Sequence, residues 1–240
     1  LRMLGIVVED RQDPFPGASG VHHPLLAEAA TQFQARAISE LFPAQGPVKT
    51  QIIGKTTDKK INQAQRVQDF MNYQVTTQIP DYFNELDQML FYLSLAGSAF
   101  KKVYFDNTLD RICTTFVPAE ELVISNDNTD LISAERYTQV MKQSVNEIKK
   151  YMVSGYYRQV PITKEQGYNL NTQDSVQKTL QRLEGMSPSM ADNLHTVLEI
   201  HADYDLGEDK SDLALPYIVT IDYETRQVLS VRRNWQEFDL

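Results

Sequence analysis

The stretch "DPFPGASGVHHPLLAEAATQFQARAISELF", Asp13 to Phe42, opens with two prolines and two glycines within eight residues and then becomes rich in alanine. Pro24 suits the first helical position, where its missing N–H leaves no hydrogen bond unmade. From there one set of side chains recurs at helical spacing: Leu26, Ala29, Ala30, Phe33, Ala37 and Leu41. The stretch therefore predicts a kinked loop and then a helix with a small-residue face that allows close packing.

One strand and two more helices are predicted downstream. "VKTQIIGK", Val48 to Lys55, has the composition of a strand. A helix over about Lys59 to Val75 directs one apolar set inward: Ile61, Ala64, Val67, Met71 and Val75. The next helix starts at Pro80, ends at Gly97 and carries a strong apolar stripe: Phe83, Leu86, Met89, Leu90 and Leu93.

Strands dominate the rest of the chain. Ala99 to Pro118 predicts a hairpin with Asn107 and Asp110 in its turn, and a further strand is expected near Ala134 to Val140. Ser144 and Glu147 have the spacing of a capping box at the start of a short helix that ends at Gly155.

Residues 163–193 are polar and weakly periodic, which predicts a mobile insertion that is partly helical around 175–183. After it, alternation predicts a strand with one apolar face: Leu198, Ile200, Ala202 and Tyr204. Strands near Tyr217 to Asp222 and Val228 to Arg233 complete an antiparallel meander.

Helices grouped first and hairpins later predict an α+β fold, in which N-terminal amphipathic helices pack on antiparallel hairpins and a C-terminal meander. We expect residues 1–240 to form a single domain. The net charge of −9 argues against tight, nonspecific binding of nucleic acid by the isolated chain. The single cysteine excludes an internal disulfide framework and fits a reducing cytosol. No apolar run approaches the roughly 18 residues that span a bilayer, so we expect no membrane partner.

Histidines offer two candidate sites. His22 and His23 are adjacent in a loop, and no cysteine or carboxylate follows at ligand spacing, so we interpret them as part of the loop. His201 alternates with Glu199 and Asp203 on the polar side of the predicted strand. A solvated strand face is our interpretation of these three residues, because no partner nucleophile can be identified.

"DYDLGEDKSDLA", Asp203 to Ala214, is the best metal candidate in the sequence. Asp203, Asp205 and Asp209 fall at positions one, three and seven of a calcium loop. However, Glu208 stands where glycine is needed and Ala214 where a bidentate glutamate belongs. An acidic hairpin loop is therefore the interpretation we prefer.

Two further candidates are also interpreted structurally. Cys113 falls mid-strand and is expected to be a small packed residue. Gly17 and Gly20 lack the preceding strand and the Gly-Lys-Ser/Thr of a phosphate loop. We therefore expect no catalytic, cofactor-binding or metal-ligating residue, no cofactor, and a protein that is not an enzyme.

The opening stretch resembles the N-terminal portion of portal proteins from short-tailed bacteriophages. The family carries a Phe-Pro-Gly-Ala-Ser loop, matched here by residues 15–19. A helix of the form Pro-Leu-x-x-Glu-Ala-x-x-Gln-Phe-Gln-Ala-Arg follows, matched by Pro24, Leu25, Glu28, Ala29, Gln32, Phe33, Gln34, Ala35 and Arg36. The resemblance continues in "LAGSAFKKVYFD", 95–106, and "PYIVTIDYETRQVLSVRRNW", 216–235. Gly20 and residues 163–193 depart from the family pattern.

The resemblance implies a non-enzymatic structural protein, the wing of a subunit that forms a ring of generally twelve copies at one capsid vertex. DNA is packaged and ejected through the ring, and the tail attaches to it. Implied partners are other copies of the chain, coat and scaffolding proteins, terminase, tail adaptor proteins and the passing double-stranded DNA. The implied location is the virion, after assembly in the host cytoplasm. The stem and clip would follow Leu240, so we expect the chain to be a fragment.

A second hypothesis belongs to a different class of protein. In it, the chain is a metal-dependent phage enzyme that processes nucleic acid, with its ion at the Asp203 to Asp209 loop. Metal titration distinguishes the two hypotheses, since the enzyme needs a divalent ion at that loop.

Overall fold

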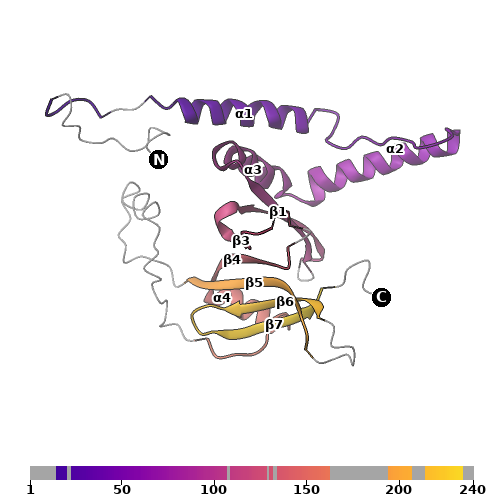
Figure 1. The fold of residues 1–240 in the computed structure, drawn as a ribbon. Helices are drawn as coiled ribbons and strands as arrows, with labels where there is room; N and C mark the ends of the chain where they lie inside the picture. The colour runs from indigo at the N-terminus through magenta and orange to yellow at the C-terminus, as the bar shows by residue number, and fades with distance from the viewer. Residues whose placement is uncertain are drawn as a thin grey trace. The chain divides into compact units, whose positions relative to one another are not determined.

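The computed structural model describes residues 15–20, 23–106, 109–128, 130–131, 134–162, 194–206 and 214–234. Within these residues the chain is α+β, with helices and two antiparallel sheets, as the sequence predicts (Figure 1). It divides into two compact units, Leu1–Ala119 and Glu120–Leu240, and each is described by itself. We expected residues 1–240 to form a single domain, and this stays a prediction. Over the described ranges, no helix has the length and apolar character needed to cross a bilayer.

In the first unit, α1 (Leu25–Leu41) begins directly after Pro24 and packs against α3 (Tyr82–Ala96). Ala30 is buried in this contact, and Gln34 Nε2 donates to the main-chain oxygen of Asp87 at 3.2 Å. The larger members of the predicted face are not covered within the unit, because Leu26, Phe33 and Leu41 are exposed. Alanine lets the two helix backbones approach closely, and the larger side chains lie outside that contact.

The second helix, α2 (Asp58–Tyr73), continues into a π-helical segment, η1 (Gln74–Gln78). The inward apolar set predicted for it is wrong, since α2 buries no residue and Ile61, Val67 and Met71 are each more than two-fifths exposed. Within the described part of the unit, no sheet or long helix covers α2; the extended chain at residues 48–50 lies along it.

The strand predicted at Val48 to Lys55 is also wrong, because this extended segment joins no β-ladder. Side chains of α2 bind its main chain instead. Gln68 Oε1 accepts from the Thr50 N–H at 3.3 Å, and the Thr50 hydroxyl donates to the Ala64 oxygen at 3.1 Å. The segment is extended as predicted, but its hydrogen-bond partners come from a helix.

The third helix and the hairpin are confirmed, although Phe83 of the predicted apolar stripe is 47% exposed. α3 buries Leu86 and Leu90 and ends at Gly97, whose φ of 75° is left-handed. The hairpin pairs β1 (Ala99–Asp106) with β2 (Arg111–Pro118), in a register that runs from Ala99 with Pro118 to Asp106 with Arg111. Asp110 lies in the turn with a positive φ, and Asn107 is outside the described residues.

The second unit contains a five-stranded antiparallel sheet in the order β3-β4-β5-β6-β7, which confirms the meander. Its strands are β3 (Leu122–Ile124), β4 (Arg136–Ser144), β5 (Leu194–Tyr204), β6 (Leu215–Asp222) and β7 (Gln227–Arg233). A short 3₁₀ helix, η2 (Ala119–Glu121), precedes β3. β4 is shifted towards Ser144 relative to the prediction, and β3 was not predicted. The predicted insertion at 163–193 lies outside the described residues.

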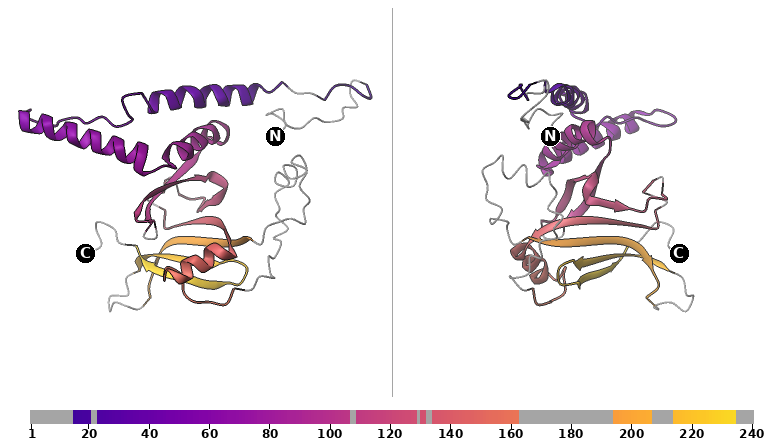
Figure 2. Two further views of the ribbon diagram at one scale, coloured as in Figure 1. Left: turned by 180° about the vertical axis from the view of Figure 1, so that it is seen from behind. Right: turned by 60° about the vertical axis from the view of Figure 1, so that its left-hand side comes forward.

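The helix α4 (Val145–Val153) has the predicted capping box between Ser144 and Glu147. It lies across one face of the sheet (Figure 2, left), where Ile148 and Met152 pack with Val197 and Leu229. The buried face of β5 is therefore the one that carries His195, Val197 and Glu199.

This outcome corrects the predicted orientation of β5. Leu198 and Ile200, expected on the core side, are half-buried, whereas Glu199, expected on a solvated face, is only 7% exposed. The apolar cover supplied by α4 selects the face of Val197, which the alternation in the sequence does not reveal.

Candidate functional site

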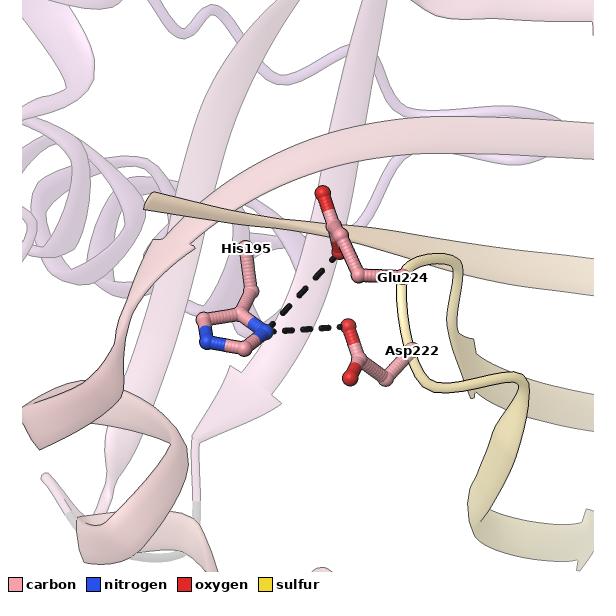
Figure 3. A group of neighbouring side chains, drawn as sticks. All are labelled: His195, Asp222 and Glu224. Carbon is pink, nitrogen blue, oxygen red and sulfur yellow. Dashed lines mark hydrogen bonds and ion pairs between the residues drawn. The ribbon is translucent and has the colours of Figure 1, made fainter. Parts of the chain in front are cut away.

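A histidine and two carboxylates meet where β5 begins and the β6–β7 turn starts (Figure 3). His195 lies on β5, Asp222 ends β6, and Glu224 follows in the turn. The antiparallel register pairs Val197 with Asp222, so the first residues of β5 lie beside the end of β6. Strand pairing thus joins side chains that are distant in the sequence, and we call them the His195 cluster.

The three side chains of the His195 cluster are close together and buried. Nδ1 of His195 lies 3.2 Å from Oδ1 of Asp222 and 3.8 Å from Oε2 of Glu224. The exposed fractions of the His195, Asp222 and Glu224 side chains are 4%, 0% and 4%. Figure 3 shows one imidazole nitrogen directed at both carboxylates.

Neighbouring groups hold the two carboxylates in place. The Thr225 hydroxyl donates to Oδ2 of Asp222, and the Thr196 N–H lies 3.0 and 2.9 Å from the two oxygens of Glu224. The Tyr223 N–H donates to the Thr196 oxygen at 2.9 Å, which ties the turn to β5. The carboxylates are therefore oriented by groups outside the cluster.

The two carboxyl groups differ in their affinity for a proton. Burial by itself raises the pKa of Asp222, but hydrogen bonds from Thr225, Glu224 and His195 outweigh it and hold the pKa below its ordinary value. Burial raises the pKa of Glu224, and its hydrogen bond with Asp222 raises that pKa further. Without another cation, Glu224 is thus the carboxyl group that takes up a proton first.

A second polar group surrounds His201, one of the residues singled out in the sequence. Its ring stacks on Tyr137 at 4.5 Å between centroids, and Nδ1 lies 3.1 Å from the Tyr137 hydroxyl. Nε2 lies 3.0 Å from Oε1 of Glu199. Burial raises the pKa of the Tyr137 hydroxyl, and the charge of Glu199 adds to that effect. The solvated face predicted here is wrong for Glu199 and His201, whose side chains are only 9% and 16% exposed, and it is confirmed for Asp203, which is exposed.

Both helices α1 and α2 expose large apolar side chains. On α1 these are Leu25, Leu26, Phe33 and Leu41, and on α2 they are Ile61, Val67, Phe70, Met71 and Tyr73. Phe70 is 57% exposed and Leu25 is 66% exposed. Single exposed apolar residues are ordinary, but a helix that buries no residue and carries five of them is typical of a contact surface. We call these nine residues the helix surface.

The other predicted candidates do not come together in a site. His23 is exposed in the loop before α1, and His22 is outside the described residues. In the candidate calcium loop, Asp203 is the second-last residue of β5 and Asp205 follows the strand. Glu208 and Asp209 of that loop lie outside the described residues. Cys113 is buried on β2 as a packed residue, as predicted.

The opening loop also has the predicted kink. Gly17 has a left-handed φ of 82°, and the Ala18 N–H donates to the Phe15 oxygen at 3.1 Å. This hydrogen bond closes a tight turn at residues 15–18, whereas α1 begins at Leu25.

His195, Asp222 and Glu224 are not among the candidate residues predicted from the sequence. Two acidic residues with one residue between them, at the point where a strand becomes a turn, are the only local signal. His195 follows directly after the predicted insertion, and its register with β6 is a tertiary property. The His195 cluster therefore could not be assembled from spacing alone.

No protein-family model matches the chain, and a search of curated proteins returns no match. The portal resemblance therefore depends on the quoted residues of the opening loop, the first helix and the two later blocks.

Proposed function

We propose that this chain is the wing portion of a bacteriophage portal protein, a structural subunit of the ring at one capsid vertex. Double-stranded DNA passes through that ring during packaging and ejection, and the tail attaches to it. The ring is part of the virion. The partners of the subunit are other copies of the chain, coat and scaffolding proteins, terminase and tail adaptor proteins. The resemblance of residues 15–36 to the family motif suggests this function.

The helix surface is the observation that carries the proposal. A subunit of a closed ring presents two contact surfaces to its neighbours, and both must be exposed in the isolated chain. Within the described part of the unit no sheet or long helix covers α2, and Phe70 and Tyr73 are each more than half exposed. A second copy of the chain is the occupant that the ring supplies.

Two neighbouring residues on one face of α1 have different roles in this proposal. Ala30 is buried against α3 and belongs to the core of the unit, whereas Phe33, one turn further along, is 45% exposed. We assign Ala30 to packing within the subunit and Phe33 to contact between subunits.

The metal-dependent enzyme remains the alternative, and the described surface offers it little. Two hollows lie along α2, one lined by polar residues from Lys59 to Arg66 and the other by Thr50–Ile53 and the facing side of the helix. Neither contains a histidine, cysteine or carboxylate. The His195 cluster is buried and opens on neither hollow.

The test compares this chain with a version extended beyond Leu240, by light scattering at low and moderate salt and by negative-stain microscopy. We expect monomers or small oligomers for the present chain, because a dozen copies with a net charge of −9 each repel one another. We expect closed rings with an axial hole for the extension.

Two substitutions on the helix surface localise the contact. Phe33→Glu and Phe70→Glu in the extended protein should prevent ring closure while circular dichroism stays unchanged. Gln32→Glu, at an exposed neighbouring position, adds the same charge without removing an apolar side chain and should still form rings. An extended protein that stays monomeric in all conditions contradicts the portal proposal. Rings from both Phe variants place the contact elsewhere.

A further inference from the structure

We propose that the His195 cluster is a structural binding site for one divalent transition-metal ion of the zinc class, coordinated by His195, Asp222 and Glu224. The ion joins the start of β5 to the β6–β7 turn. The ligand atoms are the imidazole Nδ1 and one oxygen of each carboxylate, all within 4.8 Å of one another.

The distances between these atoms fit such an ion. With bonds of about 2.0–2.2 Å in tetrahedral geometry, neighbouring ligand atoms lie about 3.3–3.6 Å apart. The imidazole nitrogen lies 3.2 Å from one carboxylate oxygen and 3.8 Å from the other. These two distances differ from the tetrahedral spacing by a few tenths of an ångström, and the two carboxylate oxygens lie within 4.8 Å of each other.

The charges of the cluster also call for a cation. Nδ1 of His195 has at most one proton, and both carboxylates face it. Within the described ranges no lysine or arginine forms an ion pair with Asp222 or Glu224. Two carboxylates that are at least 96% buried need either a second proton or a metal ion between them. A divalent ion satisfies both at once and replaces the Nδ1 proton.

The ligand types indicate which ion is held. An imidazole nitrogen with carboxylate oxygens suits zinc and its first-row neighbours, whereas calcium and magnesium prefer oxygen ligands alone. The only cysteine of the chain, Cys113, is not among the ligand atoms of this cluster.

The surroundings have the form of an outer shell. Metal-ligating carboxylates are usually held by hydrogen bonds from neighbouring groups. The Thr225 hydroxyl donates a hydrogen bond to Asp222, and the Thr196 N–H donates to Glu224. Both carboxylates are therefore oriented before an ion binds. The burial of all three side chains favours a structural role for the ion.

The test is calorimetric titration of the EDTA-treated full chain with zinc chloride, with thermal unfolding of the same samples. We expect one ion per chain and a rise of about 5–10 °C in Tm when free zinc is about 100 times its Kd. Absorption spectroscopy at the zinc edge should show nitrogen and oxygen ligands with one imidazole.

Four variants make the assignment specific. His195→Ala should abolish binding, and Glu224→Gln, which keeps an acceptor for the Thr196 N–H, should weaken it at least tenfold even if the alanine variant fails to fold. Thr225→Val should weaken binding by about 10–100-fold, because it releases Asp222. His201→Ala is the matched control, since its imidazole faces only one carboxylate, and it should bind zinc as the wild type does.

Three results overturn the assignment. These are no stoichiometric zinc binding by the wild-type chain, wild-type affinity in folded Glu224→Gln, or binding that is lost in Asp205→Ala but kept in Glu224→Gln. The last result moves the ion to the acidic loop and supports the enzyme alternative.

Discussion

Asn72 of α2 binds the main chain of Val48 at both of its polar groups. Its Oδ1 accepts from the Val48 N–H at 2.9 Å, and its Nδ2 donates to the Val48 oxygen at 3.2 Å. One side-chain amide thus does what a neighbouring strand does in a β-ladder. This pair explains why the segment after Gly46 is extended but belongs to no sheet.

Asn72→Ala should lower the free energy of unfolding by about 1–3 kcal/mol, because it leaves a half-buried N–H and C=O without their partner. Urea unfolding of the two proteins measures the difference. Gln65→Ala is the control on the same helix, since Gln65 pairs only with the exposed Asp69, and it should change stability by less than about 0.5 kcal/mol. Equal losses in the two variants would contradict a specific role for Asn72.

Gly46→Ala should destabilise the chain more than Gly54→Ala does. Both glycines have left-handed φ values, 96° and 86°, so each substitution costs about 1–2 kcal/mol in backbone strain. A Cβ at Gly46 would also lie 2.6 Å from the side chain of Asn72, whereas nothing lies within 4 Å at Gly54. Thermal unfolding of both variants gives the difference.

The contact between Gly46 and Asn72 predicts that the effects of substituting the two residues on stability are coupled. In an Asn72→Ala background, the cost of Gly46→Ala should fall to that of Gly54→Ala, because the obstructing side chain is gone. Additive losses in the double variant would show that Asn72 is not the obstacle.

Ser144→Ala should lower stability by about 0.5–2 kcal/mol through loss of the capping box of α4. The Ser144 hydroxyl oxygen accepts from the Glu147 N–H at 3.2 Å, and Glu147 Oε2 accepts from the Ser144 N–H at 2.8 Å. Ser154→Ala, at the other end of the helix, removes only an exposed bond to the Tyr151 oxygen and should cost less. Denaturant unfolding should rank the two, and the reverse ranking would refute the cap.

Lys101→Met should raise the free energy of unfolding by about 1 kcal/mol, since methionine keeps the length and removes a buried charge. Lys101 Nζ lies 3.5 Å from the ring centroid of Tyr82 and has no hydrogen-bond partner. Burial lowers its pKa, against the opposing charge of Glu85. Destabilisation by the methionine would mean that the contact with the ring outweighs the cost of burial.

The effect of Lys101→Met on the free energy of unfolding should depend on pH. The folded-state pKa of Lys101 lies below its unfolded value, so the charged form carries a penalty that is full at neutral pH. That penalty disappears as pH rises through the folded pKa towards the unfolded value of 10.5. The advantage of methionine should therefore shrink in alkaline urea titrations, and Lys102→Met is the control on the same strand.

Features set by neighbours in the chain were predictable. The capping box of α4, the stop of α3 at Gly97 and the hairpin from Ala99 to Pro118 all follow from residues within a few positions of one another. The turn residues and caps act through local hydrogen bonds and dihedral preferences, which are the same in any fold. The α+β class came from the same local signals, although β3 was not predicted and the strand predicted at Val48 to Lys55 was wrong.

What each element contacts was decided only by the tertiary structure. The apolar pattern of α2 predicts burial but does not say whether this chain covers it, and the alternation of β5 does not say which face α4 takes. The His195 cluster exists because the register of β5 on β6 brings His195 beside Asp222. Sequence spacing records the period of a helix or strand, whereas partners distant in the chain are selected by packing and strand register, which are properties of the whole fold.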